Sequence, residues 1–370
     1  MFGFHQKQKR GSYRKPVKRF LNVSEGYRVD LSLFSSSGER DAIIASSGMG
    51  KSWLTGVIVE ESLRNNVLSC VIDPEGEYWT LAEKFPVLVV GGDTAHLPMH
   101  QALIELYIDT MLETVLSVVF DLSEYIDAQQ CELYALIADM IFMKESQHKK
   151  KMRLIVEEAQ IYAPQGLSSK GGEASQRIAK RGRKRGLDSL WATQRPQAID
   201  KNVLSQCNRF WFGGIQSELD YKAIKTYVEQ AGISFNDLKA LHPGQFDYYS
   251  HGKTEAITVR KRYCRHGAST PGLTGGGASS GSIPTHPLVK ELFGIIKPDV
   301  EAILANQVDN EEQASKEQAE IARLKELLEK KDRQIQELKA ELNKERLFKE
   351  FAGRMGVPPG KPGSQVRLIR

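Results

Sequence analysis

A run of small residues followed by lysine and serine is the strongest chemical signal in this sequence. An apolar segment leads into Ala45, and the next residues read Ser-Ser-Gly-Met-Gly-Lys-Ser. Backbone N–H groups in such a turn bind phosphate oxygens, and the helix that starts there adds its positive dipole end. The spacing is that of a P-loop, with Ala45 in place of the first glycine. The predicted nucleotide-binding residues are Ser47, Gly48, Met49, Gly50, Lys51 and Ser52.

An acidic pair closes a second apolar segment. Residues 152–156 read Met-Arg-Leu-Ile-Val and are followed by Glu157 and Glu158. In a P-loop enzyme the lysine contacts the β- and γ-phosphates, the Ser hydroxyl ligates Mg²⁺, and carboxylates complete the site. We therefore expect Ser52 and Glu157 to hold Mg²⁺ and Glu158 to act as the general base. The expected cofactors are ATP and Mg²⁺.

Polar residues follow two further strand-like segments. Ligands of such sheets lie beyond the carboxyl ends of the strands, so Thr193 and Gln194 should face the γ-phosphate. The segment that ends at Asp73 continues as Pro-Glu-Gly-Glu-Tyr and includes Glu77. Its acidic residues fit a role near the nucleotide or an ordinary Pro/Gly turn.

Basic residues are concentrated in two places. Residues 1–20 contain seven lysines and arginines and no acid, which fits a DNA-binding arm or a solvated tail. Residues 178–186 read Ile-Ala-Lys-Arg-Gly-Arg-Lys-Arg-Gly. An arginine there could stabilise charge on a nucleotide held by a neighbouring subunit, or it could contact DNA. The spacing does not choose between these roles.

The alternation of strand-like and helix-like segments predicts an α/β fold with a mostly parallel sheet covered by helices. Parallel strands buried on both faces read as continuous apolar runs. The predicted strands are Ala42–Ser46, Val67–Asp73, Val87–Val90, Arg153–Glu157, Ser189–Thr193 and Arg209–Gly213. The predicted helices are residues 51–64, 101–118, 128–144, 173–185 and 217–231, with a hairpin at 245–249 and 256–262.

The composition changes after about residue 266. We divide the chain into a basic segment 1–35, an ATPase domain 36–266, a Gly/Ser-rich linker 267–284, a helical segment 285–352 and a disordered basic tail 353–370. Apolar residues recur every seven positions from 321 to 342, as in a coiled coil that joins subunits or binds a protein partner. Lys331 and Glu345 stand on the same seam and favour the alternative of a single solvated helix.

Bulk properties exclude several classes of protein. The chain has 370 residues, is 41% hydrophobic and carries a formal net charge of +5. Its four cysteines are scattered without a C-x-x-C pair, which predicts a reducing environment without disulfides or zinc. We see no membrane span and no secretory signal, and we expect a cytoplasmic protein.

Taken together, these segments resemble the HerA/FtsK superfamily of P-loop motor ATPases, and the HerA side most closely. The resemblance covers about residues 36–266 and rests on A-S-S-G-M-G-K-S, I-D-P-E-G-E-Y, L-I-V-E-E-A-Q, R-G-R-K-R-G-L and A-T-Q-R-P. It implies a RecA-like core assembled as a hexameric ring around DNA, most simply double-stranded. It also implies Glu158 as base, Gln194 as γ-phosphate sensor, Arg183 as a finger acting on the neighbouring subunit, and Asp73 and Glu77 near the nucleotide.

The leading hypothesis is therefore an ATP-driven DNA translocase with helicase-like pumping activity. Reduced motors of this superfamily include genome-packaging ATPases of viruses and mobile elements, which form the first alternative. The second is an ATP-switched oligomeric scaffold for a partner nuclease or effector. The acidic pair and Gln194 favour active hydrolysis over the scaffold.

Overall fold

The computed structural model describes residues 20–30, 38–148, 151–267, 283 and 285–354. Large parts of the expected basic segment, linker and tail lie outside these residues. By internal contacts the chain divides into two units, Met1–Glu301 and Ala302–Arg370. No helix in the described part of the chain is long and apolar enough to cross a membrane.

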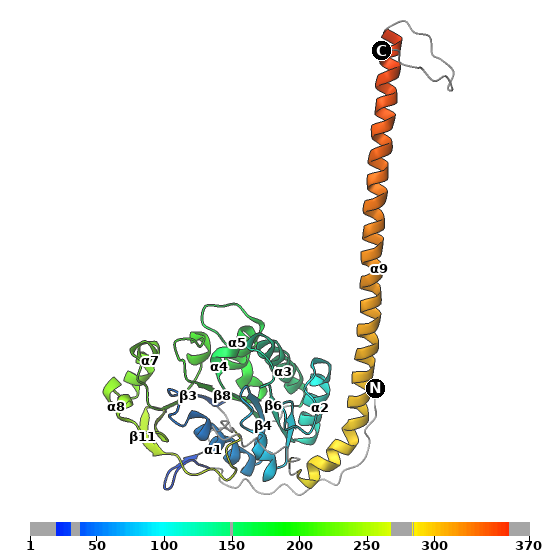
Figure 1. Ribbon diagram of the computed structural model, residues 1–370. Helices are drawn as coiled ribbons and strands as arrows, with labels where there is room; N and C mark the ends of the chain where they lie inside the picture. Colours follow the sequence, from blue (N-terminus) through cyan, green and yellow to red (C-terminus); the bar gives the residue numbers. More distant parts are fainter. Residues whose placement is uncertain (1–19, 31–37, 149–150, 268–282, 284, 355–370) are drawn as a thin grey trace, which may run out of the picture. The chain divides into compact units, whose positions relative to one another are not determined.

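The first unit is built on a nine-stranded sheet with the order β11-β10-β9-β3-β8-β7-β4-β6-β5 (Figure 1). The strands from β9 to β5 are parallel to their neighbours, whereas β10 runs antiparallel to β9 and β11. The α/β prediction is therefore confirmed. The sheet strands are β3 Arg40–Ile44, β4 Leu68–Asp73, β5 Val87–Val90, β6 Ser117–Asp121, β7 Met152–Val156, β8 Leu187–Thr193, β9 Arg209–Phe212, β10 Gln245–Ser250 and β11 Lys253–Thr258. A separate antiparallel pair is formed by β1 Phe20–Asn22 and β2 Arg28–Asp30.

Helices and short 3₁₀ turns connect the strands. They are α1 Lys51–Arg64, η2 Trp79–Glu83, η3 Gln101–Leu103, α2 Ile104–Thr114, α3 Asp127–His148, α4 Ala159–Tyr162, α5 Lys170–Arg181, η4 Gly182–Arg185, α6 Lys201–Leu204, α7 Glu218–Gln230, α8 Phe235–Ala240 and α9 Pro287–Arg354. Helix α1 covers one face of the sheet, and α2, α3 and α5 pack together on the other (Figure 1). Central strands such as β4 and β8 are buried along their whole length, which fits their mainly apolar sequences, although β8 also contains Asp188 and Ser189.

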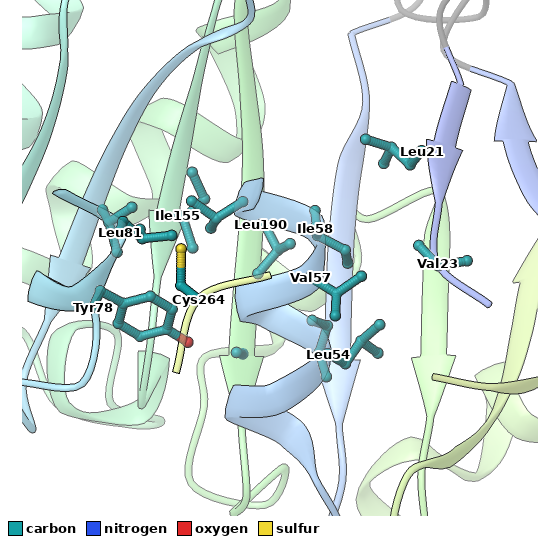
Figure 2. Close-up of a cluster of buried hydrophobic side chains, with 14 of the residues drawn as sticks. Leu21, Val23, Leu54, Val57, Ile58, Tyr78, Leu81, Ile155, Leu190 and Cys264 are labelled. Carbon is teal, nitrogen blue, oxygen red and sulfur yellow. The ribbon is translucent and has the colours of Figure 1, made fainter. Parts of the chain in front are cut away.

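The core beneath α1 fixes the helix that follows the phosphate-binding turn. Leu54, Val57 and Ile58 of α1 are buried and face Ile155 of β7 and Leu190 of β8 (Figure 2). Because apolar burial contributes about 25 cal/mol per Å², this contact anchors the first turn of α1 against the centre of the sheet.

Strand β6 is absent from the sequence prediction, as are the short strands β1 and β2. Residues 101–118 were expected to form a helix, but α2 ends at Thr114 and β6 begins at Ser117. The helix stops because Val115 adopts a left-handed backbone with φ 57°. Glycine usually marks such a helix end, and its absence here concealed the boundary. Strand β6 brings Asp121 beside Asp73 at the end of β4.

A buried cluster of charges lies at the opposite, amino-terminal ends of the strands. Arg209 of β9 donates to both carboxylate oxygens of Asp41 in β3, at 2.9 and 2.6 Å. Trp211 donates to the same carboxylate at 3.0 Å, and Arg153 of β7 lies 3.8 Å away. Burial acts to raise the pKa of Asp41, but the two guanidinium groups outweigh it and lower that pKa. The cluster therefore contributes stability only as a complete set.

We expect Asp41→Asn to lower the free energy of unfolding by about 3 kcal/mol, because Glu39, 3.2 Å from Arg209, is then left to balance the buried guanidinium charge without Asp41. Urea unfolding followed by circular dichroism measures this change. Lys222→Ala, which removes one partner of an exposed pair with Glu218, should leave the free energy of unfolding unchanged. Equal stability of the wild type and Asp41→Asn would show that the cluster does not stabilise the fold.

Candidate nucleotide-binding site

The turn between β3 and α1 has the conformation that a phosphate-binding loop needs. Gly48 and Gly50 have φ values of 78° and 90°, in the region that glycine adopts most easily. A Cβ on Gly50 would also come within 3.1 Å of the backbone nitrogen of Gly244. The first N–H groups of α1 have no partner within the helix, so they point out of its start toward the turn. The loop is thus open to an anion.

Lys51 is held between the two predicted carboxylates. Its Nζ lies 2.7 Å from Glu157 Oε2 and 2.6 Å from Glu158 Oε1, and all three side chains are buried. Burial alone would lower the pKa of Lys51, but the adjacent carboxylates raise it well above its ordinary value. Lys51 is therefore a permanent cation, and its charge is balanced by the acidic pair.

Glu157 has a further partner that the sequence analysis did not select. The hydroxyl of Tyr78 donates to Glu157 Oε1 at 2.6 Å and also reaches the carbonyl of Ser52 at 3.3 Å. Burial acts to raise the pKa of Glu157, but the charge of Lys51 and hydrogen bonds from Lys51, Tyr78 and Thr55 lower it, so this carboxylate stays ionised. Tyr78 belongs to the I-D-P-E-G-E-Y segment, of which the sequence analysis selects Asp73 and Glu77 as candidate site residues.

Glu158 is oriented by a short chain of hydrogen bonds. Gln160 donates from Nε2 to Glu158 Oε2 at 2.6 Å, and Thr193 donates to Gln160 Oε1 at 2.6 Å. The backbone of Glu158 is left-handed, with φ 44°. Gln194 lines an open pocket of about 600 Å³ together with Glu158 and Arg195. The structure thus places Gln194 beside Glu158, and it adds Gln160 as a link from Glu158 to Thr193.

Asp73 makes the contacts of a turn-capping residue. Its carboxylate accepts hydrogen bonds from the backbone N–H groups of Tyr78 at 2.9 Å and Glu75 at 3.3 Å. Complete burial, together with the neighbouring Asp121, raises the pKa of Asp73 to about 8. Asp73 is therefore largely protonated at neutral pH, which favours the turn alternative for this residue. Glu77 instead lies 3.6 Å from His266.

The basic cluster lies at the other end of the sheet. Turn η4 precedes β8, so its side chains are at the amino-terminal ends of the strands, away from Lys51 of the same chain. Arg183 is exposed and lines an open pocket of about 850 Å³ with Arg181 and Lys184. Arg185 is already engaged, because it donates to the carbonyl of Phe142 at 2.6 Å and lies over that ring. Arg183 is thus exposed at this end of the sheet, and Arg185 is held against Phe142.

Comparison with known proteins identifies the family of this part of the chain. Residues 25–181 match the family model described as the central domain of helicase HerA. The chain carries a HerA/FtsK-type P-loop ATPase domain. The resemblance inferred from the motifs is therefore confirmed.

Individual relatives match part of this chain. The DNA double-strand break repair helicase HerA of Pyrococcus furiosus is 44% identical over 106 residues, which is 29% of this chain and 18% of that protein. A probable helicase of Methanocaldococcus jannaschii is 35% identical over 98 residues, covering 26% of this chain and 19% of the relative. The matched segments thus span less than a fifth of these relatives.

A solved structure shares the fold at low sequence identity. VirB4 of Thermoanaerobacter pseudethanolicus aligns with a TM-score of 0.50 and 13% identity, over 67% of this chain and 97% of that one. This likeness supports the architecture of the HerA-type domain.

The raised pKa of Asp73 predicts a pH-dependent stability. The protonated form is favoured in the folded state, so its contribution is complete below about pH 4 and is lost as the pH rises toward 8. Asp73→Asn removes this loss. Its stability relative to the wild type should rise by about 2 kcal/mol between pH 6 and 8.5 in urea unfolding.

Asp299→Asn, at an exposed position of α9, is the control for this measurement. It should show the same difference from the wild type at each pH. A pH-independent difference for Asp73→Asn would mean that Asp73 is ionised in the folded protein.

Proposed function

We propose that this chain is an ATP-hydrolysing DNA translocase that works as a ring, most simply a hexamer. The observation that carries the proposal is the position of Lys51 between Glu157 and Glu158, behind an open phosphate-binding turn. This arrangement joins a phosphate-binding cation to a candidate general base. The relatives named above are helicases, which supports DNA as the partner.

In the proposed reaction, the γ-phosphate draws Lys51 away from the carboxylates. Glu158 then loses its counterion and can accept a proton from water, while Gln160 holds it in place. The water oxygen bonds to the γ-phosphorus, the bond to the β-phosphate oxygen breaks, and ADP and phosphate leave. Gln194 lines the pocket where this water would lie. Binding of ATP thus also frees the base, Glu158, from its counterion.

Mg²⁺ fits the residues on this side of the site. The hydrogen bonds of Tyr78 to Glu157 and to the Ser52 carbonyl bring the carboxylate beside the first turn of α1. We infer that the Ser52 hydroxyl and Glu157, directly or through water, would hold the ion. Bound Mg²⁺ neutralises charge on the phosphates.

The position of Arg183 supports the proposed ring. It cannot serve the nucleotide of its own chain from the far end of the sheet, whereas a neighbouring copy could receive it. Charge stabilisation by such an arginine is worth several orders of magnitude in rate in phosphoryl transfer. The other exposed basic residues of this pocket are available to DNA phosphates.

We expect ATP hydrolysis to increase on addition of linear double-stranded DNA, and the increase to fade as salt is raised from low to moderate concentration. Glu158→Gln should lower kcat at least 100-fold and leave ATP binding intact, because the amide keeps the shape of the side chain and cannot accept a proton. Glu218→Gln, on the surface of α7, should behave as wild type.

Lys51→Ala is a poorer test, because it leaves two buried carboxylates without a counterion and should destabilise the fold. Wild-type turnover in Glu158→Gln would remove Glu158 from the base role. Slow ATP hydrolysis whose rate does not change when DNA is added would favour a nucleotide-switched scaffold instead.

We further propose that α9 joins copies of the chain through its apolar seam. The seam residues are exposed at helical spacing: Ile321, Leu324, Leu328, Ile335, Leu338 and Leu342. Deleting residues 310–370 should lower the oligomer mass in light scattering. Ile335→Lys should do the same, whereas Glu326→Lys on the outer side of the helix should not. An unchanged mass after deletion would assign the seam to a protein partner.

A further inference from the structure

A strap formed by residues 259–267 crosses α1 and leads to Tyr78. Trp53 of α1 donates to the carbonyl of Arg260 at 2.9 Å. The N–H groups of Tyr263 and Cys264 donate to Glu60 at 2.8 and 2.9 Å. These contacts join the strap to the helix that begins at the phosphate-binding turn.

The same strap also contacts the segment that follows Tyr78. Thr80 donates to the carbonyl of Arg265 at 2.8 Å, and the N–H of Gly267 donates to the carbonyl of Glu77 at 3.2 Å. Figure 2 shows Cys264 of the strap beside Tyr78. Tyr78 is therefore fixed on the strap side as well as by its own turn.

Arg262 of the strap packs against the ring of Tyr78. Its side chain is fully buried and forms an ion pair with Glu60 at 3.4 Å. The guanidinium carbon lies 5.7 Å from the centre of the Tyr78 ring, within cation–π range. This contact restrains the ring and so directs the hydroxyl toward Glu157.

The need for such a restraint follows from the proposed ATP-bound state. Lys51 would then contact phosphate, and Glu157 would lose its counterion while remaining buried. A buried carboxylate without hydrogen bonds is free to turn or to become neutral. The Tyr78 hydroxyl, at 2.6 Å from Oε1, does not depend on Lys51 and stays in place.

We propose that Tyr78 is a positioning residue that holds Glu157 in the orientation needed for Mg²⁺–ATP, and that Arg262 of the strap fixes Tyr78 for this role. The inference rests on the proposed ATPase function. It assigns a task to a tyrosine hydroxyl that does not itself touch the nucleotide.

The test compares Tyr78→Phe with Tyr107→Phe. Both replacements remove one buried hydroxyl and keep the ring, since Tyr107 donates to the carbonyl of Pro98 at 2.7 Å, away from Glu157. The affinity for fluorescent mant-ATP is measured in EDTA and in saturating Mg²⁺. The Mg²⁺ concentration that gives half-maximal hydrolysis is measured in parallel.

For Tyr78→Phe we expect affinity in EDTA within about twofold of the wild type. The gain in affinity on adding Mg²⁺ should fall about tenfold, as for loss of a hydrogen bond to a charged group. The half-maximal Mg²⁺ concentration should rise to match. Tyr107→Phe should keep the wild-type Mg²⁺ dependence even if it unfolds at a lower temperature.

A second variant tests the same role if Tyr78→Phe does not fold. Arg262→Lys keeps a positive charge beside Glu60 and removes the flat guanidinium over the ring. It should weaken the Mg²⁺-dependent gain about threefold and leave binding in EDTA unchanged.

The outcomes separate this inference from the proposed function. Wild-type protein that neither binds nor hydrolyses ATP would overturn both. Active wild-type protein together with an unchanged Mg²⁺ dependence in Tyr78→Phe, or an equal loss in Tyr107→Phe, would overturn the role of Tyr78 alone.

Discussion

The ion pairing of Lys51 with Glu157 and Glu158 is the interaction on which the site depends. Each of these groups would be costly to bury alone, and together they form a balanced set. The set requires the phosphate-binding turn, the end of β7 and the start of α1 to meet at one place. A phosphate that takes over Lys51 would change the charge balance of the whole site, so in the proposed reaction nucleotide binding also frees the carboxylate of Glu158.

The parallel sheet separates two kinds of charged residue. The groups that meet at the carboxyl ends of the strands can exchange partners with a ligand. The Asp41–Arg209 cluster at the amino ends is enclosed and serves the fold. Arg183 also lies at this second edge, but unlike the cluster it is exposed.

Much of this arrangement could be predicted because its signals are local. The turn before Lys51 is one short stretch of sequence, the acidic pair directly follows β7, and the central strands are mainly apolar. Strand β6 was missed because a valine ends the preceding helix without a glycine signal.

The role of Tyr78 could not be predicted in the same way. It depends on contact with Glu157, 79 positions away in sequence. Arg260 and Arg262 likewise read as surface charges, and their burial against Glu60 appears only once the strap has crossed α1. Such pairings arise from the packing of distant segments, which residue type and spacing do not record.

The left-handed backbone of Glu158 has a consequence for how this site can change over time. An L-residue with a side chain stores strain of about 1 kcal/mol in that conformation, and glycine would relieve it. The residue that fits this backbone conformation with the least strain is therefore glycine, which has no carboxylate. If Glu158 has the proposed role, selection for stability and selection for activity favour different residues at this position.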